Sequence, residues 1–232
     1  MNCVDKLFLQ YMARKFQFAV DEFYHLYNRG NDKRVIFVDD SDKERLLKLL
    51  YLCNSADPFV FRDITEVESM AWKTSTDTLT DIGAYCLMPN HFHLLVHEKE
   101  ENGISRFMQK LSTAYTMYFN KKHERHGALF EGRFKATHAE EDRYLEYLFA
   151  YIHLNPIKLI DPDWKERGLA DVEGSEQFLN SYSYSSYWDY IGRKREEATI
   201  LNRLAFPEYF GSAKDFRSFL NSWLNFSSES FT

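Results

Sequence analysis

Two histidines flank a single phenylalanine in the stretch HFHLLV. On a β-strand, residues two apart point to the same face, roughly 6.6–7 Å from each other, so His91 and His93 would present two imidazoles side by side. Phe92 would point to the opposite, apolar face. Two convergent imidazoles form part of a metal site and need a third ligand from elsewhere in the chain. The alternative, from these residues alone, is a pair of hydrogen-bonded core histidines.

A second group of reactive side chains lies in the segment YLEYLFAYIHLNP. Tyr147, Tyr151 and Asn155 are spaced four residues apart and therefore lie on one stripe of a helix. The residue before a proline is biased away from helical geometry, so we expect the Asn155 amide, next to Pro156, to turn toward a neighbouring site. The chain has 15 tyrosines, and packing is the alternative role for any of them. Spacing alone does not single out Tyr151.

Basic residues gather in one segment of an otherwise acidic chain. There are 29 Lys and Arg against 35 Asp and Glu, a net charge of −6, which argues against a general nucleic-acid binder. Residues 106–135 nevertheless hold seven basic and two acidic residues. This local positive excess indicates either a nucleic-acid contact or a solvated helix face.

Length and composition bound the class of protein. The 232 residues suffice for one good-sized domain, or for one domain with a smaller appendage, and an aromatic content of 17% provides a sizeable core. No apolar run approaches the roughly 18 residues that span a bilayer, and the N-terminal segment lacks the features of a signal peptide. Three widely spaced cysteines argue against a disulfide framework or a zinc knuckle. We therefore expect a cytoplasmic protein with no membrane contact.

The elements that must position these residues follow from the hydrophobic pattern and the turn signals. Alternation of strands and helices predicts an α+β fold, an antiparallel sheet with helices packed on one side, followed by a mostly helical or irregular C-terminal part. In chain order we expect a strand and turn at 23–31, a helix at 39–55, an irregular insertion at 58–80, a hairpin with strands at 82–87 and 92–98, a helix at 102–124, a strand pair or bent strand at 128–139, a helix at 140–155 ended by Pro156, and a last helix at 212–226.

Five segments, in order, resemble one protein family. YHLYNRGN, MPNHFHLLV, RFMQKLSTAYTMYFNKKH, GALFEGRFKA and YLFAYIHLNPIK are similar to the single-tyrosine HUH transposases, in particular the branch of REP-associated tyrosine transposase-like proteins. The resemblance runs from about residue 23 to residue 158. It implies a ferredoxin-like sheet with the histidine pair on a central strand, a catalytic domain over residues 1–160, and a C-terminal extension over residues 161–232 packed on that domain.

The resemblance also implies roles for individual residues. The nucleophile carries over to Tyr151, and the third metal ligand, a polar side chain one helical turn later, carries over to Asn155 beside His91 and His93. The implied cofactor is Mg²⁺ or Mn²⁺, although ligand chemistry alone would also accept zinc at two imidazoles. Attack by Tyr151 would give a 5′-phosphotyrosine and a free 3′-hydroxyl, and the retained phosphodiester energy would allow strand transfer without ATP.

The implied partner is single-stranded or hairpin DNA in the bacterial cytoplasm, with positive side chains neutralising its backbone. The expected DNA-binding residues are Arg29, Lys110, Lys121, Lys122, Arg125, Arg133 and Lys135. The aromatic run at 181–192 either stacks on bases or forms a structural cap.

Two other functions stay open. One is a DNA-binding protein on the same fold whose chemistry has lapsed, and the other is a metal-dependent phosphoesterase in which Tyr151 only packs. The sequence also leaves open a homodimer in which the tyrosine helix is exchanged between two chains.

Overall fold

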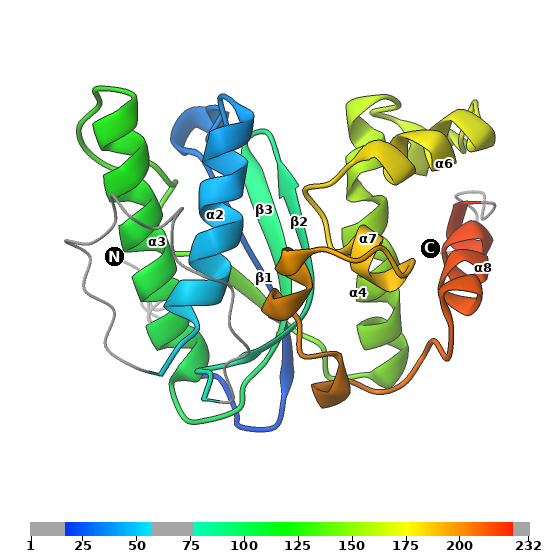
Figure 1. Cartoon of the computed structure of the whole chain (residues 1–232), viewed down its shortest axis with the longest axis horizontal. Helices are drawn as coiled ribbons and strands as arrows, with labels where there is room; N and C mark the ends of the chain where they lie inside the picture. The colour runs from blue at the N-terminus through cyan, green and yellow to red at the C-terminus, as the bar shows by residue number, and fades with distance from the viewer. Residues whose placement is uncertain (1–16, 57–76, 225–232) are drawn as a thin grey trace, which may run out of the picture.

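Four strands form one antiparallel sheet in the computed structural model, which describes residues 17–56 and 77–224 (Figure 1). The sheet order is β2-β3-β1-β4, and each neighbouring pair is antiparallel. One helix follows β1 and another follows β3, so the core has the ferredoxin-like βαββαβ arrangement. This confirms the predicted α+β fold. The strands are β1 (Phe23–Arg29), β2 (Asp81–Met88), β3 (His91–His97) and β4 (Lys135–His138).

The predicted hairpin places the histidine pair on an inner strand. In the pairing of β2 with β3, Met88 lies opposite His91 and Cys86 lies opposite His93. On the other side of β3, Tyr27 of β1 lies opposite His93. Directly paired residues point to the same face of a sheet, so these side chains surround the two imidazoles. Both neighbours of β3 therefore shape the site.

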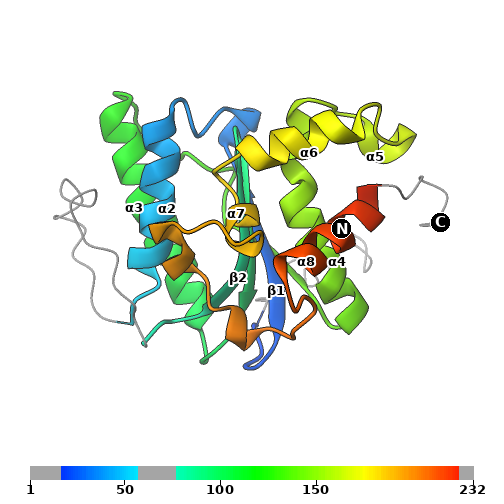
Figure 2. The same ribbon diagram turned by 45° about the vertical axis from the view of Figure 1, so that its right-hand side comes forward.

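Helices cover both faces of the sheet (Figures 1 and 2). Helices α2 (Asp40–Cys53) and α3 (Gly103–Lys122) pack on the face that carries Leu26, Phe92 and Leu94. Helix α4 (Asp142–Leu154) packs on the opposite face, the one that carries the histidines.

The expectation of helices on one side thus holds for α2 and α3 and is wrong for α4. The reason lies in β2, which is apolar on both faces, and in Leu95 on the histidine face of β3. The residues that point toward α2 and α3 form a first core. Ala84, Cys86 and Leu95 point to the other face, are fully buried, and form a second core with α4. A sheet that is apolar on both faces needs a covering layer on each.

Helix α4 ends at Leu154, just before the proline, but the chain does not leave helical geometry there. Asn155 keeps helical dihedral angles, with φ −55° and ψ −39°, and the chain continues as the 3₁₀-helix η3 (Asn155–Leu159). Pro156 occupies the first turn of that 3₁₀-helix, where its missing N–H would lack a partner in any case. The expected departure of Asn155 from helical geometry is therefore wrong. Its side chain instead stays on the Tyr151 stripe, one turn further on.

The C-terminal part packs on the α4 side and shares the second core (Figure 2). Phe206, Tyr190 and Phe210 surround Phe149 of α4, with ring centroids 5.7–6.0 Å away. The helices of this part are α5 (Trp164–Arg167), α6 (Val172–Ser181), α7 (Tyr187–Tyr190), η4 (Glu196–Ile200), η5 (Arg203–Ala205) and α8 (Ala213–Leu224).

The same part of the chain is hydrogen-bonded to the backbone of β2. The Leu87 N–H donates to the Tyr184 carbonyl at 2.9 Å, and the Ser186 N–H donates to the Tyr85 carbonyl at 3.0 Å. Further along, the Asn202 N–H donates to the Ile82 carbonyl at 3.0 Å.

The aromatic run at 181–192 is largely structural. The Tyr182 hydroxyl donates to the Leu87 carbonyl of β2. Tyr187 and Tyr190 are buried, and the Tyr190 hydroxyl donates to the Gly83 carbonyl at 2.8 Å. These contacts favour the structural cap over the stacking of bases for these three tyrosines.

The remaining expectations concern irregular and apolar segments. The stretch expected as a strand pair at 128–139 forms β4 and an isolated bridge between Gly30 and Phe130. Most of the insertion expected at 58–80 lies outside the described residues. None of the helices in the described ranges combines the length and apolar character needed to cross a bilayer.

Candidate active site

His91 and His93 lie side by side at the start of β3, with ring centroids 4.9 Å apart and ring planes nearly perpendicular. The Nδ1 atom of His91 is 2.6 Å from the Asn90 amide oxygen, which can only accept, so Nδ1 carries the proton. The Nδ1 atom of His93 is hydrogen-bonded to Nε2 of His25 at 2.9 Å. Within the described residues, neither Nε2 atom of the pair makes a hydrogen bond. This is the arrangement of metal-binding histidines whose other nitrogen is held by a neighbour.

All three imidazoles are neutral at physiological pH. Burial lowers the pKa of His91 to about 4, with the charges of Lys158 and Arg29 adding to the effect. Burial likewise lowers the pKa of His25 to about 4 and that of His93 well below its usual value. A neutral imidazole keeps the lone pair that a metal ion requires.

Tyr151 of α4 lies over the histidines of the same chain. Its ring centroid is 5.5 Å from the ring of His93 and 5.5 Å from the ring of His25, in edge-on geometry. Burial raises the pKa of Tyr151, and the carboxamide of Asn155 lowers it in part. The side chain is therefore a phenol in the resting protein, placed beside the imidazoles without any exchange of helices.

Asn155 is 1% exposed, and its Nδ2 atom has no hydrogen-bond partner in the described part of the chain. A buried, unsatisfied amide costs about 1–3 kcal/mol. Half a turn about the last side-chain bond would present the amide oxygen in place of the nitrogen. Asn155 thus places a carboxamide with an unsatisfied nitrogen one turn from Tyr151.

The donors around Tyr151 fit a divalent cation. Within the described ranges, no three His, Cys, Asp or Glu side chains converge to hold a metal, so an all-protein cage of those residue types is not present there. Two neutral imidazoles and a carboxamide instead give mixed nitrogen and oxygen donors. Such a set suits Mn²⁺ and tolerates Mg²⁺.

His25 was missed from the sequence, although a signal for it exists. In FYHLYNR, the alternation of a strand puts His25, Tyr27 and Arg29 on one face. Only the pairing of β1 with β3, which sets Tyr27 opposite His93, reveals that this face is the histidine face. Lys165 was also missed. It lies in α5, with Nζ 4.1 Å from the centre of the Tyr151 ring, and no motif marks it.

The predicted DNA-binding residues divide between the two faces of the sheet. Arg29 lies opposite His91, and Lys135 lies opposite Tyr27, so both are on the histidine face. Arg29 is paired with Glu131 at 2.8 Å. Arg133 is exposed in the loop before β4.

The others lie on or just after α3, which covers the opposite face. Lys110 donates to the Ser55 carbonyl at 2.7 Å, Arg125 donates to the Asn120 amide oxygen at 2.8 Å, and Lys121 is exposed.

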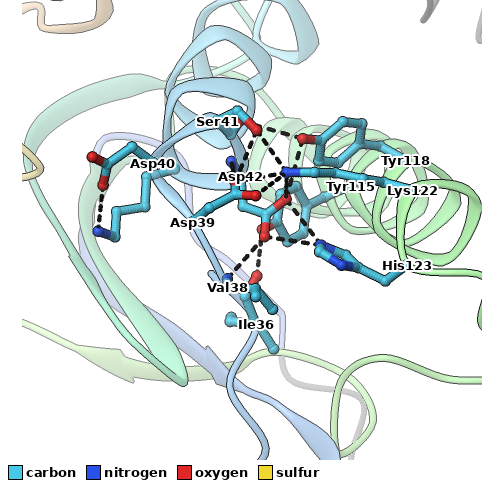
Figure 3. Close-up of polar contacts among 11 residues, drawn as sticks. Ile36, Val38, Asp39, Asp40, Ser41, Asp42, Tyr115, Tyr118, Lys122 and His123 are labelled. Carbon is cyan, nitrogen blue, oxygen red and sulfur yellow. Dashed lines mark hydrogen bonds and ion pairs between the residues drawn. The ribbon is translucent and has the colours of Figure 1, made fainter.

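Lys122 is held in an ion-pair cluster between α2 and α3 (Figure 3). Its Nζ lies 2.6 Å from a carboxylate oxygen of Asp39 and 2.8 Å from one of Asp42. Asp42 is fully buried and also contacts His123 Nε2 at 3.0 Å. The hydrogen bond from Lys122 lowers the pKa of Asp39 to about 2. In this conformation Lys122 ties the start of α2 to the end of α3.

An inner-strand histidine pair beneath a helix-borne tyrosine, on a βαββαβ sheet, is the framework of a transposase of the single-tyrosine HUH class. A family model described as "Transposase IS200 like" matches residues 20–155, more than half of the chain, and the chain belongs to this family. The predicted resemblance to the single-tyrosine HUH transposases is confirmed.

A solved structure supports the same fold. It is that of a REP-associated tyrosine transposase bound to a REP hairpin, with a TM-score of 0.50 and 13% sequence identity, and the match covers 79% of this chain and 88% of that one. No curated protein matches the chain.

Proposed function

We propose that this protein is a metal-dependent, single-stranded DNA transposase that nicks and rejoins hairpin-flanked DNA through a 5′-phosphotyrosine intermediate. One observation carries the proposal: Tyr151 lies beside the ring of His93, which is next to that of His91, and the Asn155 side chain acts on the same phenol from one helical turn away. Membership of the IS200-like transposase family supports strand transfer as the reaction. The hairpin bound by the solved relative supports hairpin DNA as the substrate.

His91, His93 and Asn155 would hold the cation, Mg²⁺ or Mn²⁺. When bound, the ion supplies positive charge to the scissile phosphate and orients it. His25 keeps the ring of His93 in place through the hydrogen bond between the two imidazoles. The ring contacts on either side of Tyr151 restrict its phenol to the neighbourhood of the histidines. These side chains therefore position the two reacting groups.

The reaction transfers the phosphoryl group of one DNA phosphodiester from a 3′-oxygen to Tyr151. The Tyr151 oxygen bonds to phosphorus, the bond from phosphorus to the 3′-oxygen breaks, and the 3′-oxygen leaves. The phenol gives up its proton, and the departing 3′-oxygen takes one, so charge is conserved. Burial raises the pKa of Tyr151, so the phenol needs activation before it can attack.

The experiment is to incubate the full chain with Mn²⁺ and a labelled single-stranded oligonucleotide that contains the hairpin flanking its own gene. We expect a covalent adduct that survives denaturation, absent in Tyr151→Phe and in His91→Ala, and absent after addition of a chelator. Circular dichroism of both variants should match that of the wild-type protein, which excludes unfolding as the cause.

The same assay separates the two alternatives. Hairpin binding without cleavage by the wild-type protein would support a lapsed DNA-binding protein. Cleavage that survives Tyr151→Phe would support a metal-dependent phosphoesterase in which Tyr151 only packs. Either result would overturn the proposal.

A further inference from the structure

A lysine of the C-terminal part lies against the proposed nucleophile. Lys165 Nζ is 4.1 Å from the centre of the Tyr151 ring and 5.5 Å from the centre of the Trp164 ring. Within residues 17–56 and 77–224, this ammonium makes no ion pair and no hydrogen bond. Its neighbours are therefore aromatic faces, which attract a cation but do not neutralise it.

The segment that carries Lys165 is anchored on both sides. Trp164, the preceding residue, is buried in the second core. Arg167 donates to the Asp161 carboxylate at 2.6 Å and thereby closes the turn around α5. The position of the ammonium over the Tyr151 ring is thus imposed by the fold of the C-terminal part.

A second lysine adds charge to the same region. Lys158, in η3, is half-buried and likewise makes no ion pair or hydrogen bond with a described residue. Burial, aided by Lys158, lowers the pKa of Lys165 to about 8. Within the described ranges neither ammonium is ion-paired, and exposed Glu166 offsets the burial of Lys165 only in part.

An ammonium that is partly removed from water and lacks a counter-charge is costly. The cost is recovered when an anion enters. The anion that the proposed function brings to Tyr151 is a DNA phosphodiester, since the phenol must approach phosphorus.

We propose that Lys165 binds the scissile phosphate of the DNA, so that the C-terminal part of the chain completes the active site. This inference rests on the proposed function and extends it: the residue contacts the substrate directly, from outside the segment that the family model matches. Lys158 adds to the positive potential, while Lys165 makes the contact beside the phenol.

The first test measures binding without cleavage. The binding test uses a Tyr151→Phe background, which keeps the ring beneath the lysine. In this background Lys165→Met should weaken the affinity for a hairpin with a single-stranded flank about tenfold. The salt dependence of that affinity should fall by about one phosphate contact. Lys165→Arg should retain most of the affinity. Lys194→Met, a change of an exposed lysine in the same part of the chain, should have no effect.

The flank serves as the internal control. A hairpin trimmed of its single-stranded flank lacks the scissile phosphate, so Lys165→Met should not change its affinity. Equal affinity of Lys165→Met and its parent for the flanked hairpin would overturn the inference. An equal loss of affinity for both hairpins would also overturn it, because it would indicate a structural effect or a contact away from the scissile position.

The second test measures the reaction. With Tyr151 present and DNA saturating, Lys165→Met should slow single-turnover adduct formation about 10- to 30-fold, and Lys165→Arg should restore it. If the wild-type protein forms no adduct, the proposed function fails, while the binding test still decides whether Lys165 contacts the flank. If the wild-type protein forms the adduct and Lys165→Met does so at the same rate, this inference fails and the proposed function stands.

Discussion

The imidazole rings of His25 in β1 and His93 in β3 are hydrogen-bonded to each other, with Nε2 of His25 2.9 Å from Nδ1 of His93. The two residues are 68 positions apart in the chain and meet only because β1 and β3 pair. The bond leaves Nε2 of His93 available for a ligand and fixes the orientation of its ring. A histidine outside the HxH motif therefore helps to define the site.

Removal of the hydrogen bond between His25 and His93 should weaken metal binding. His25→Ala should lower the affinity for Mn²⁺ about 10- to 100-fold, the usual effect of losing a residue that orients a metal ligand. Calorimetric titration with Mn²⁺ gives the affinity directly. His25→Gln, whose amide can still hydrogen-bond to Nδ1, should recover part of the loss, and the exposed His126→Ala should change nothing. An unchanged affinity in His25→Ala would show that His93 does not depend on its neighbour.

The unpaired amide of Asn155 gives a prediction with opposite signs for stability and binding. Asn155→Leu removes a buried polar atom without a partner, so in the presence of a chelator the free energy of unfolding should stay the same or rise by about 1 kcal/mol. Mn²⁺ binding should be lost. Asn155→Asp keeps an oxygen ligand and should still bind the ion. A clear loss of metal-free stability in Asn155→Leu would mean that the amide is already satisfied.

Lys122 and Lys135 were both predicted to bind DNA, and their surroundings now distinguish them. Lys122→Met leaves the buried Asp42 with fewer partners, so it should lower the free energy of unfolding by about 2 kcal/mol and leave hairpin affinity unchanged. Lys135→Met, on the histidine face, should weaken hairpin affinity with little effect on stability. Denaturant unfolding and fluorescence-anisotropy titration measure the two effects. A loss of hairpin affinity in Lys122→Met with unchanged stability would instead indicate that Lys122 contacts DNA.

The ion-pair cluster around Lys122 also predicts that the free energy of unfolding depends on pH in the acid range. Lys122 lowers the pKa of Asp39 to about 2, below the value of about 4 in an unfolded chain. A carboxyl whose pKa falls on folding adds stability above its unfolded pKa, and that stability is lost as the pH drops through the folded pKa. The difference in stability between the wild-type protein and Lys122→Met should therefore shrink between about pH 4 and pH 2. A difference that stays constant over this range would exclude the Asp39 contact as its source.

Much of the fold and part of the site could be predicted from local patterns. The β2–β3 hairpin follows from two apolar runs around Pro89 and Asn90, and α3 follows from its apolar stripe. The sharing of one face by His91 and His93 needs only the two-residue period of a strand. These are short-range properties, which the sequence itself carries.

What escaped prediction depends on contacts between distant segments. His25 joins the site through strand pairing, and Lys165 through the packing of the C-terminal part. The position of α4 on the second face depends on residues such as Ala84 and Cys86. Small residues of this kind occur on half-exposed strands as well as on buried ones. Asn155 was misjudged because the bias before a proline is weaker than the continuity of a buried helix.

The backbone hydrogen bonds between the C-terminal part and β2 have one more consequence. Strand β2 is the outermost strand on its side of the sheet, and without Tyr184, Ser186 and Asn202 its backbone N–H and C=O groups would be open to another chain. Bare outer strands of this kind recruit neighbours and promote aggregation. A protein cut near Asp161 would therefore tend to self-associate, and its failure in the adduct assay would reflect solubility as much as the chemistry of the site.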